Sequence, residues 1–150
     1  METDWSGVAT RYVNSTGDNS DGTSTGKGWT SIHSCVNWLR TASAPAECVV
    51  TAGETVGNTT AATNWSNITG DRRIRSSIAG TKATVSWTAD VLFLPMTGDN
   101  NSDLRIYDIA MIRTGSATFN AVHRMFGAGS LFLRNSITWT CGGMIGLSWG

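Results

Sequence analysis

Two arginines and two aromatic residues occupy matched positions in two similar stretches of this chain, 27 residues apart. If these stretches lay side by side in register, Arg105 would lie beside Phe132 and Tyr107 beside Arg134. A guanidinium over an aromatic ring is stabilised by about 0.5–1 kcal/mol at an exposed site, and the same rings could hold a sugar ring. We therefore predict that these four residues form a carbohydrate-binding strip. The alternative is that neighbouring side chains here only stabilise a sheet.

Other residue types that could carry chemistry stand alone in the sequence. Asp18 and Asp21 suggest a calcium loop, but their spacing does not match an EF-hand and no Glu follows at the required distance. We predict instead a solvated loop that is bonded to itself. His33 has no paired carboxylate or nucleophile in the nearby sequence, so a solvated histidine is predicted rather than a catalytic one. No metal and no cofactor is predicted.

Two stretches must position the strip, and each predicts a strand, a tight corner and a second strand. In residues 104–112 and 131–139 apolar residues alternate before the corner, which gives each first strand an inward face. Asp108 and Asn135 take the corners, because short polar side chains tolerate a left-handed backbone. Recurrence at a period of 27 residues is typical of a solenoid. The alternative is a chance match between two strands of an ordinary β-sandwich.

One helix is predicted over residues 30–41. Its apolar residues fall at i, i+3, i+4 and i+7, which makes a single stripe of Ile32, Cys35, Val36 and Leu39. Thr30 or Ser31 can cap its start, and Pro45 stops it. A short loop leads on to an apolar strand, so the helix would lie across the start of the sheet as a lid.

Further strands are predicted from alternating or apolar runs, at residues 11–13, 47–51, 72–75, 84–87 and 91–94. The 72–75 strand, with Ile78 after it, has a basic outer face. Residues 114–129 are predicted to hold an excursion, and residues 144–147 the start of one more strand.

Composition limits the classes of protein. At 150 residues one domain is expected, and 11 acidic residues balance 11 basic ones without a basic stripe, so nucleic acid is not a predicted partner. The longest apolar run, residues 91–96, is too short to span a bilayer. The N-terminus has no basic start and no apolar segment, so no signal peptide is evident.

Three cysteines, Cys35, Cys48 and Cys141, match no zinc pattern. Cys35 and Cys48 could pair if the segments that hold them touch. The odd count and the lack of an export signal favour thiols, so three thiols are the expectation and one disulfide is the alternative.

Five stretches together resemble a known family, the right-handed parallel β-helix proteins of the pectin-lyase-like superfamily. Residues 11–22 and 29–39 look like the first segment and capping helix of such proteins. Residues 47–55 look like their first strand and turn, and residues 104–112 and 131–139 look like successive coils.

The resemblance implies an all-β fold, a right-handed parallel β-helix that is incomplete at its C-terminus, with one N-terminal capping α-helix. Residues 1–28 would be a polar N-terminal segment, and residues 29–150 would hold the helix and the first coils in a single domain that continues past Gly150. Because no cap follows the last predicted strand, further C-terminal coils or a homotrimer would cover the open end.

The family includes polysaccharide lyases, glycoside hydrolases, phage tail spikes and surface adhesins, so the resemblance does not settle activity. We expect the N-terminal part of a carbohydrate-binding surface, phage-tail-like or secreted-type protein, extracellular or virion-associated, with no assignable catalytic residue. The alternative is the N-terminal part of a lyase or hydrolase. Such enzymes are expected to use a Lys or Arg base beside a calcium ion, or paired carboxylates. The charged residues near the strip form no matching set: Asp99, Asp103, Arg105, Asp108 and Arg134.

Overall fold

The computed structural model describes residues 3–57, 69–87, 94–95, 103–113, 123–125, 131–140 and 147–149. Within these residues the chain forms one helix, α1 (Ile32–Thr41), and twelve strands. The strands are β1 (Ala9–Val13), β2 (Ala46–Val50), β3 (Thr55–Gly57), β4 (Arg72–Ser76), β5 (Ala83–Trp87), β6 (Leu94–Pro95), β7 (Leu104–Tyr107), β8 (Ile109–Arg113), β9 (His123–Met125), β10 (Leu131–Arg134), β11 (Ile137–Thr140) and β12 (Leu147–Trp149).

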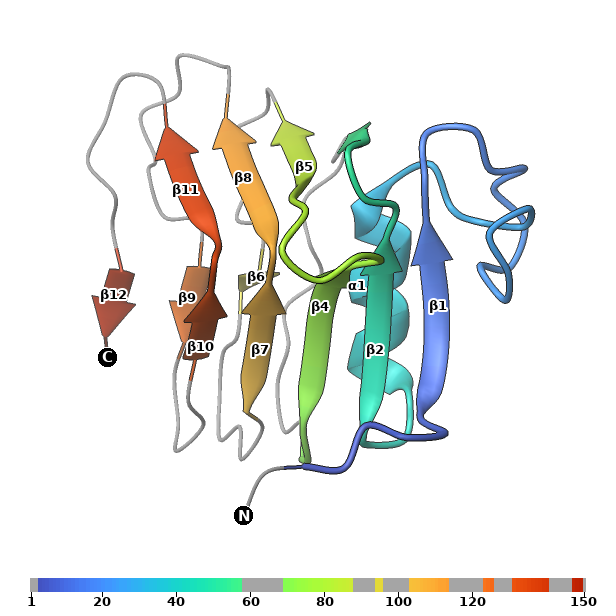
Figure 1. Ribbon diagram of the computed structural model, residues 1–150. Coiled ribbons are helices and arrows are strands. Elements are labelled where there is room, and N and C mark those ends of the chain that lie inside the picture. The colour runs from blue at the N-terminus through green and yellow to red at the C-terminus, as the bar shows by residue number, and fades with distance from the viewer. Residues whose placement is uncertain are drawn as a thin grey trace.

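The described strands make three parallel sheets (Figure 1). The first sheet has the order β1-β2-β4-β7-β10, the second has the order β11-β8-β5-β3, and the third has the order β12-β9-β6. Helix α1 lies behind β1 and β2 of the first sheet and packs on both. The predicted strands at residues 11–13, 47–51, 72–75 and 84–87 are confirmed as β1, β2, β4 and β5.

The two similar stretches pair as the sequence predicted. Leu131 lies opposite Leu104, and the register continues to Arg134 opposite Tyr107, with the two strands parallel. Asp108 alone separates β7 from β8, and its φ is 59°. Asn135, which follows β10, has a φ of 49°. The predicted left-handed corners are therefore confirmed, and each one turns the chain from the first sheet into the second.

The prediction of an all-β, right-handed parallel β-helix is wrong. Across the described residues the three sheets do not close into a solenoid. Among those residues, β1 and β2 have no third-sheet counterpart, and α1 packs against them instead. The repeat in the sequence covers only residues 104–112 and 131–139. It therefore determined how neighbouring strands pair, and it contained no information on closure.

The apolar stripe of α1 is buried against the first sheet, as predicted. Ser31 caps the helix by accepting a hydrogen bond from the backbone N–H of His33. Burying a large aliphatic side chain contributes about 1.5–3 kcal/mol, and the stripe joins one continuous core. Its members are Val13, Ile32, Cys35, Val36, Leu39, Ala46, Cys48, Val50, Val56, Ile74, Ala83, Val85, Leu104, Ile106, Ile109 and Met111.

A buried arginine fastens the end of α1 to the first sheet. Arg72 of β4 points inward, its Nε donates to the carbonyl of Leu39 at 2.8 Å, and its Nη2 donates to the carbonyl of Ala42 at 2.7 Å. The last carbonyls of a helix lack partners within the helix and carry partial negative charge, so a guanidinium suits them.

The expectation of three thiols is wrong, because Cys35 and Cys48 form a disulfide with a Cα–Cα distance of 6.1 Å. Cys35 belongs to the buried stripe of α1, and Cys48 is an inward residue of β2. Packing the helix on the sheet brings the two together, and the sequence could not specify that contact. Cys141 lies outside the described residues.

The polar loop after β1 folds back along the edge of that strand. Tyr12 donates its backbone N–H to the carbonyl of Gly22 and accepts from the N–H of Trp29, at 2.8 and 3.0 Å. This covers part of a strand edge that would otherwise be open to other chains. Asp18 and Asp21 each accept hydrogen bonds from the residue two places on, so the predicted self-bonded loop is confirmed.

Several predicted elements fall partly or wholly outside the described residues. Of the 91–94 strand only Leu94 is described, as part of β6. Of the 114–129 excursion the structure describes β9, and of the predicted C-terminal strand it describes Leu147, in β12. Ile78 lies in the turn after β4 and is 59% exposed.

Candidate functional site

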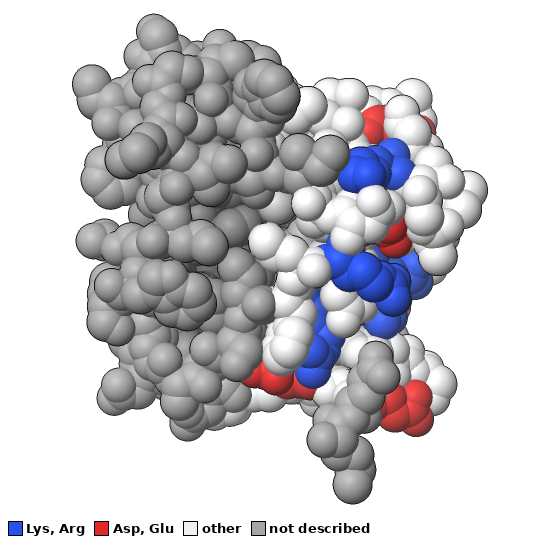
Figure 2. Space-filling model, turned by 60° about the vertical axis from the view of Figure 1, so that its left-hand side comes forward, with Lys and Arg blue, Asp and Glu red and all other residues white. Residues whose placement is uncertain are grey.

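The face of the first sheet that points away from the core carries two rows of side chains, which we call the outer face. Residues alternate along each strand, so the partners of one outward residue are also outward. The first row is Thr10, Glu47, Arg73, Arg105 and Phe132. The second row is Tyr12, Val49, Arg75, Tyr107 and Arg134. Figure 2 shows Lys and Arg atoms gathered in a band on one side of the molecule.

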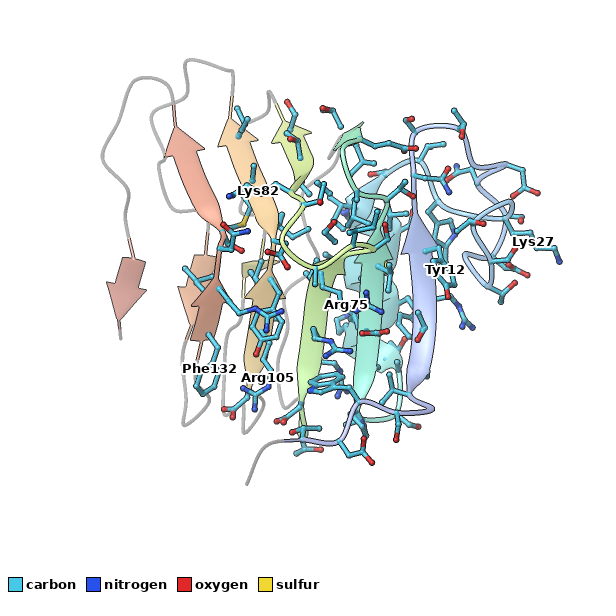
Figure 3. All side chains as sticks on the ribbon, in the orientation of Figure 1. Tyr12, Lys27, Arg75, Lys82, Arg105 and Phe132 are labelled. Carbon is cyan, nitrogen blue, oxygen red and sulfur yellow. A yellow bond between two sulfur atoms is a disulfide. The ribbon has the colours of Figure 1, made fainter. Side chains whose placement is uncertain are left out.

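The four residues of the predicted strip come together at one end of this face. The guanidinium carbon of Arg105 lies 4.4 Å from the ring centre of Phe132, and that of Arg134 lies 4.1 Å from the ring centre of Tyr107. Arg105 and Phe132 can be followed on β7 and β10 in Figure 3. The predicted pairing of these side chains is confirmed.

Arg105 is held from several sides. Its Nη2 lies 3.3 Å from Asp71 and 3.6 Å from Asp103, and its side chain is only 10% exposed. The ring of Phe132 stacks on the guanidinium of Arg105, and Phe132 as a residue is 42% exposed. Arg105 therefore fixes the position of the ring. Solvent or a ligand that approaches the outer face contacts Phe132 before it contacts Arg105.

Arg134 has a different environment. Its side chain is 62% exposed, and its nearest carboxylate is Asp108 at 3.9 Å. Asp108 is bonded elsewhere, because Asn135 donates its amide to it at 2.7 Å. That side-chain hydrogen bond holds the pKa of Asp108 below its usual range. Burial acts in the opposite direction, and the backbone N–H of Gly80 adds to the lowering.

A second cluster on the outer face was not predicted as a site. Glu47 is buried and accepts from Arg73 Nε at 2.8 Å, from Arg75 Nε at 3.0 Å and from Arg75 Nη2 at 3.1 Å. Burial by itself raises the pKa of Glu47, but the hydrogen bonds from both arginines outweigh it, so the pKa is lowered. The sequence did predict a basic outer face for β4. Because side chains alternate along a strand, Arg73 and Arg75 point to the same face.

Trp5 adds a third pair of an arginine and an aromatic ring. The guanidinium carbon of Arg73 lies 4.1 Å from the centre of the Trp5 ring. Trp5 precedes β1, in a stretch without periodicity, and the path of the backbone brings it to β4. No local pattern in the sequence could have predicted this contact.

The residues considered for catalysis do not assemble into a set. Asp103 and Asp108 each face an arginine of the outer face, and Asp99 lies outside the described residues. In the part of the chain that the structure describes, no three His, Cys, Asp or Glu side chains come close enough to hold a metal ion. His33 was predicted to be solvated, but it is half-buried, its Nε2 lies 2.8 Å from the amide nitrogen of Asn37, and burial lowers its pKa.

Comparison with known proteins gives no relative for this site. The chain matches no protein-family model, no curated protein and no solved structure. The described residues contain no helix with the length and apolar character needed to cross a membrane.

Proposed function

We propose that the outer face binds carbohydrate at the end formed by Arg105, Tyr107, Phe132 and Arg134. The observation that carries this proposal is the partly exposed Phe132, whose ring stacks on the guanidinium of Arg105 and is flanked by a second arginine–aromatic pair, Arg134 of β10 and Tyr107 of β7. Neighbouring strands lie about 4.8 Å apart, and the two rings are offset by two residues along the strands, so they lie diagonally across β7 and β10.

Sugar rings suit such a surface for two reasons. One side of a sugar ring carries mainly C–H groups, which pack against the negative face of an aromatic ring. Its hydroxyl groups take hydrogen bonds from the edges of guanidinium groups, which carry five N–H donors in a planar array. The outer face offers both kinds of group within one pair of strands.

The disulfide supports a location for this function. Disulfides persist mainly in oxidising compartments and at cell or virion surfaces, and Cys35–Cys48 is fully buried. A secreted, surface or virion-associated carbohydrate-binding protein accounts for both the disulfide and the outer face. Among the described strands β10 is the outermost of the first sheet, and its inward residue Leu133 is 47% exposed, so the protein partner that we propose is a second copy of the chain against β10, as in a homotrimer.

Binding to immobilised polysaccharides tests the proposal. The panel contains neutral members (dextran, xylan and mannan) and acidic members (carboxymethyl-dextran, dextran sulfate and alginate). Phe132→Ala is expected to weaken binding about fivefold or more, which corresponds to about 1 kcal/mol for a lost aromatic contact. Ile78→Ala is the matched control, because Ile78 is an exposed apolar residue of the turn after β4 and is not one of the four strip residues.

Two results would refute the proposal. One is the absence of binding to every member of the panel by the folded protein. The other is unchanged affinity in Phe132→Ala, which would mean that the arginine–aromatic pairs only stabilise the sheet.

A further inference from the structure

Four of the described arginines lie on the outer face, and the guanidinium groups of three of them are paired closely with carboxylates. Arg73 and Arg75 both donate to Glu47, and Arg105 pairs with two aspartates. The side chains of these three arginines are between 10% and 31% exposed. Each guanidinium lies within 3.6 Å of a carboxylate oxygen. These three groups have little capacity left for a ligand.

Arg134 is the exception among the described arginines of this face. Arg134 is the most exposed of the four, and its side chain donates no hydrogen bond to the described residues. Within the described part of the chain, the carboxylate that it approaches is that of Asp108, at 3.9 Å. The ring of Tyr107 supports one flat side of the guanidinium. Stacking uses the face of a guanidinium and leaves its edge donors available, and these match carboxylate and sulfate oxygens in a two-point geometry.

A second cation stands at the same corner. Lys82, in the turn before β5, donates to the amide oxygen of Asn135 at 2.7 Å. Asn135 in turn donates to Asp108 at 2.7 Å, and Asp108 faces Arg134. A chain of contacts therefore joins two cations to a single buried carboxylate, which leaves the corner with a net positive charge. Figure 3 shows Lys82 above the ends of β7 and β10, beside β5 and β8 of the second sheet.

We infer that Arg134, with Lys82 beside it, is an anion-binding subsite, and that the carbohydrate taken by the outer face is acidic, with carboxylate or sulfate groups. This inference rests on the proposed function and names its class of ligand. The rings of Tyr107 and Phe132 contact the sugar, and the edge of Arg134 binds the charged substituent.

The overall charge of the chain makes the inference specific. Acidic and basic residues balance, 11 against 11, so general attraction of polyanions is weak and a preference for acidic ligands must come from a local site. Arg40, an exposed residue of α1 on the opposite side of the first sheet, has the same chemistry without an aromatic neighbour in the described part.

The experiment compares dextran, carboxymethyl-dextran and dextran sulfate, which share one backbone and differ in charge. The wild-type chain is expected to bind the two charged polymers at least about tenfold more tightly than dextran, a difference of about 1.4 kcal/mol. Arg134→Gln is expected to reduce this ratio to about threefold or less, and Lys82→Gln to reduce it partly. Arg134→Lys keeps the charge without the planar fork and is expected to fall between. Arg40→Gln, which makes the same change in net charge, is expected to leave the ratio unchanged.

Each alternative outcome is decisive. Binding restricted to the neutral members of the panel overturns the anion subsite and leaves the proposed function standing. A ratio that survives in Arg134→Gln places the anion elsewhere and overturns the inference. Binding of duplex DNA as tightly as dextran sulfate would show a general polyanion surface instead of a glycan site. Absence of binding to all polysaccharides overturns both this inference and the proposed function.

Discussion

Breaking the Cys35–Cys48 disulfide is expected to lower the free energy of unfolding by about 3 kcal/mol. The bond joins helix α1 to strand β2 across a separation of 13 residues. In the unfolded chain it closes a short loop and removes conformations that the reduced chain would explore. In the folded chain both sulfurs lie in the core, so the bond also keeps the helix seated on the sheet.

The magnitude follows from the loop length. For a loop of this size the chain-entropy relation gives about 10 cal/mol/K, which is about 3 kcal/mol at 25 °C. A domain of ordinary stability has about 5–15 kcal/mol in total, so loss of the bond removes a large fraction. Because both cysteines are fully buried, a reductant should reach them only when the chain opens, and the native protein should resist reduction.

Urea unfolding with and without a phosphine reductant measures this difference, in a Cys141→Ser background that leaves a single pair. Thiol titration of the unreduced, unfolded wild-type chain should give one thiol per chain. The Cys35→Ala, Cys48→Ala double variant should unfold at the same low urea concentration with and without the reductant. A titration of three thiols, or a reductant effect below about 1 kcal/mol, would show that the reasoning is wrong.

Three further predictions concern contacts that hold the outer face and its corner. Because Glu47 has a lowered pKa in the folded state, its contribution to stability is full above its ordinary pKa of 4.5 and is lost as the pH falls through the folded pKa. Urea unfolding from about pH 7 to about pH 3 should therefore show a shallower decline of the free energy of unfolding in Glu47→Gln than in the wild type. Arg72→Met removes the donors to the carbonyls of Leu39 in α1 and of Ala42, which follows it, and should lower the free energy of unfolding by about 2–4 kcal/mol. A smaller loss is expected in Arg72→Lys, and thermal and urea unfolding measure both. Asp108→Ala forces alanine into a left-handed backbone and should cost about 1–2 kcal/mol, whereas Asp108→Asn should cost less, and equal losses in the two variants would show that the corner does not depend on backbone conformation.

The predicted part of the site depended on local pattern. Alternation along 104–107 and 131–134, with a fixed offset, was enough to place Arg105 beside Phe132 and Tyr107 beside Arg134. A parallel register repeats the same geometry from strand to strand, so similar stretches place their side chains in matching rows. The helix and the corners were predictable for a similar reason, because each depends on residues within one or two turns of chain.

The unpredicted part of the site depended on long-range contacts. Trp5 reaches Arg73, and Glu47 joins Arg73 to Arg75, only because the first sheet brings these segments together. The same limit explains the two errors on the fold. The disulfide required the packing of α1 on β2, and the closure of a solenoid could not be judged from one repeat of 27 residues.

By itself the sequence determined the identity and spacing of the short elements, the left-handed corners at Asp108 and Asn135, and the register of β7 with β10. These features follow from backbone sterics and from the two-residue period of a strand, which act over a few residues. The tertiary structure alone decided that Cys35 meets Cys48, that three of the outer arginines are paired closely with carboxylates, and that Arg134 makes only a 3.9 Å approach to Asp108. Those outcomes depend on which distant segments pack together and on how much water each charge retains, and neither quantity is contained in a local pattern.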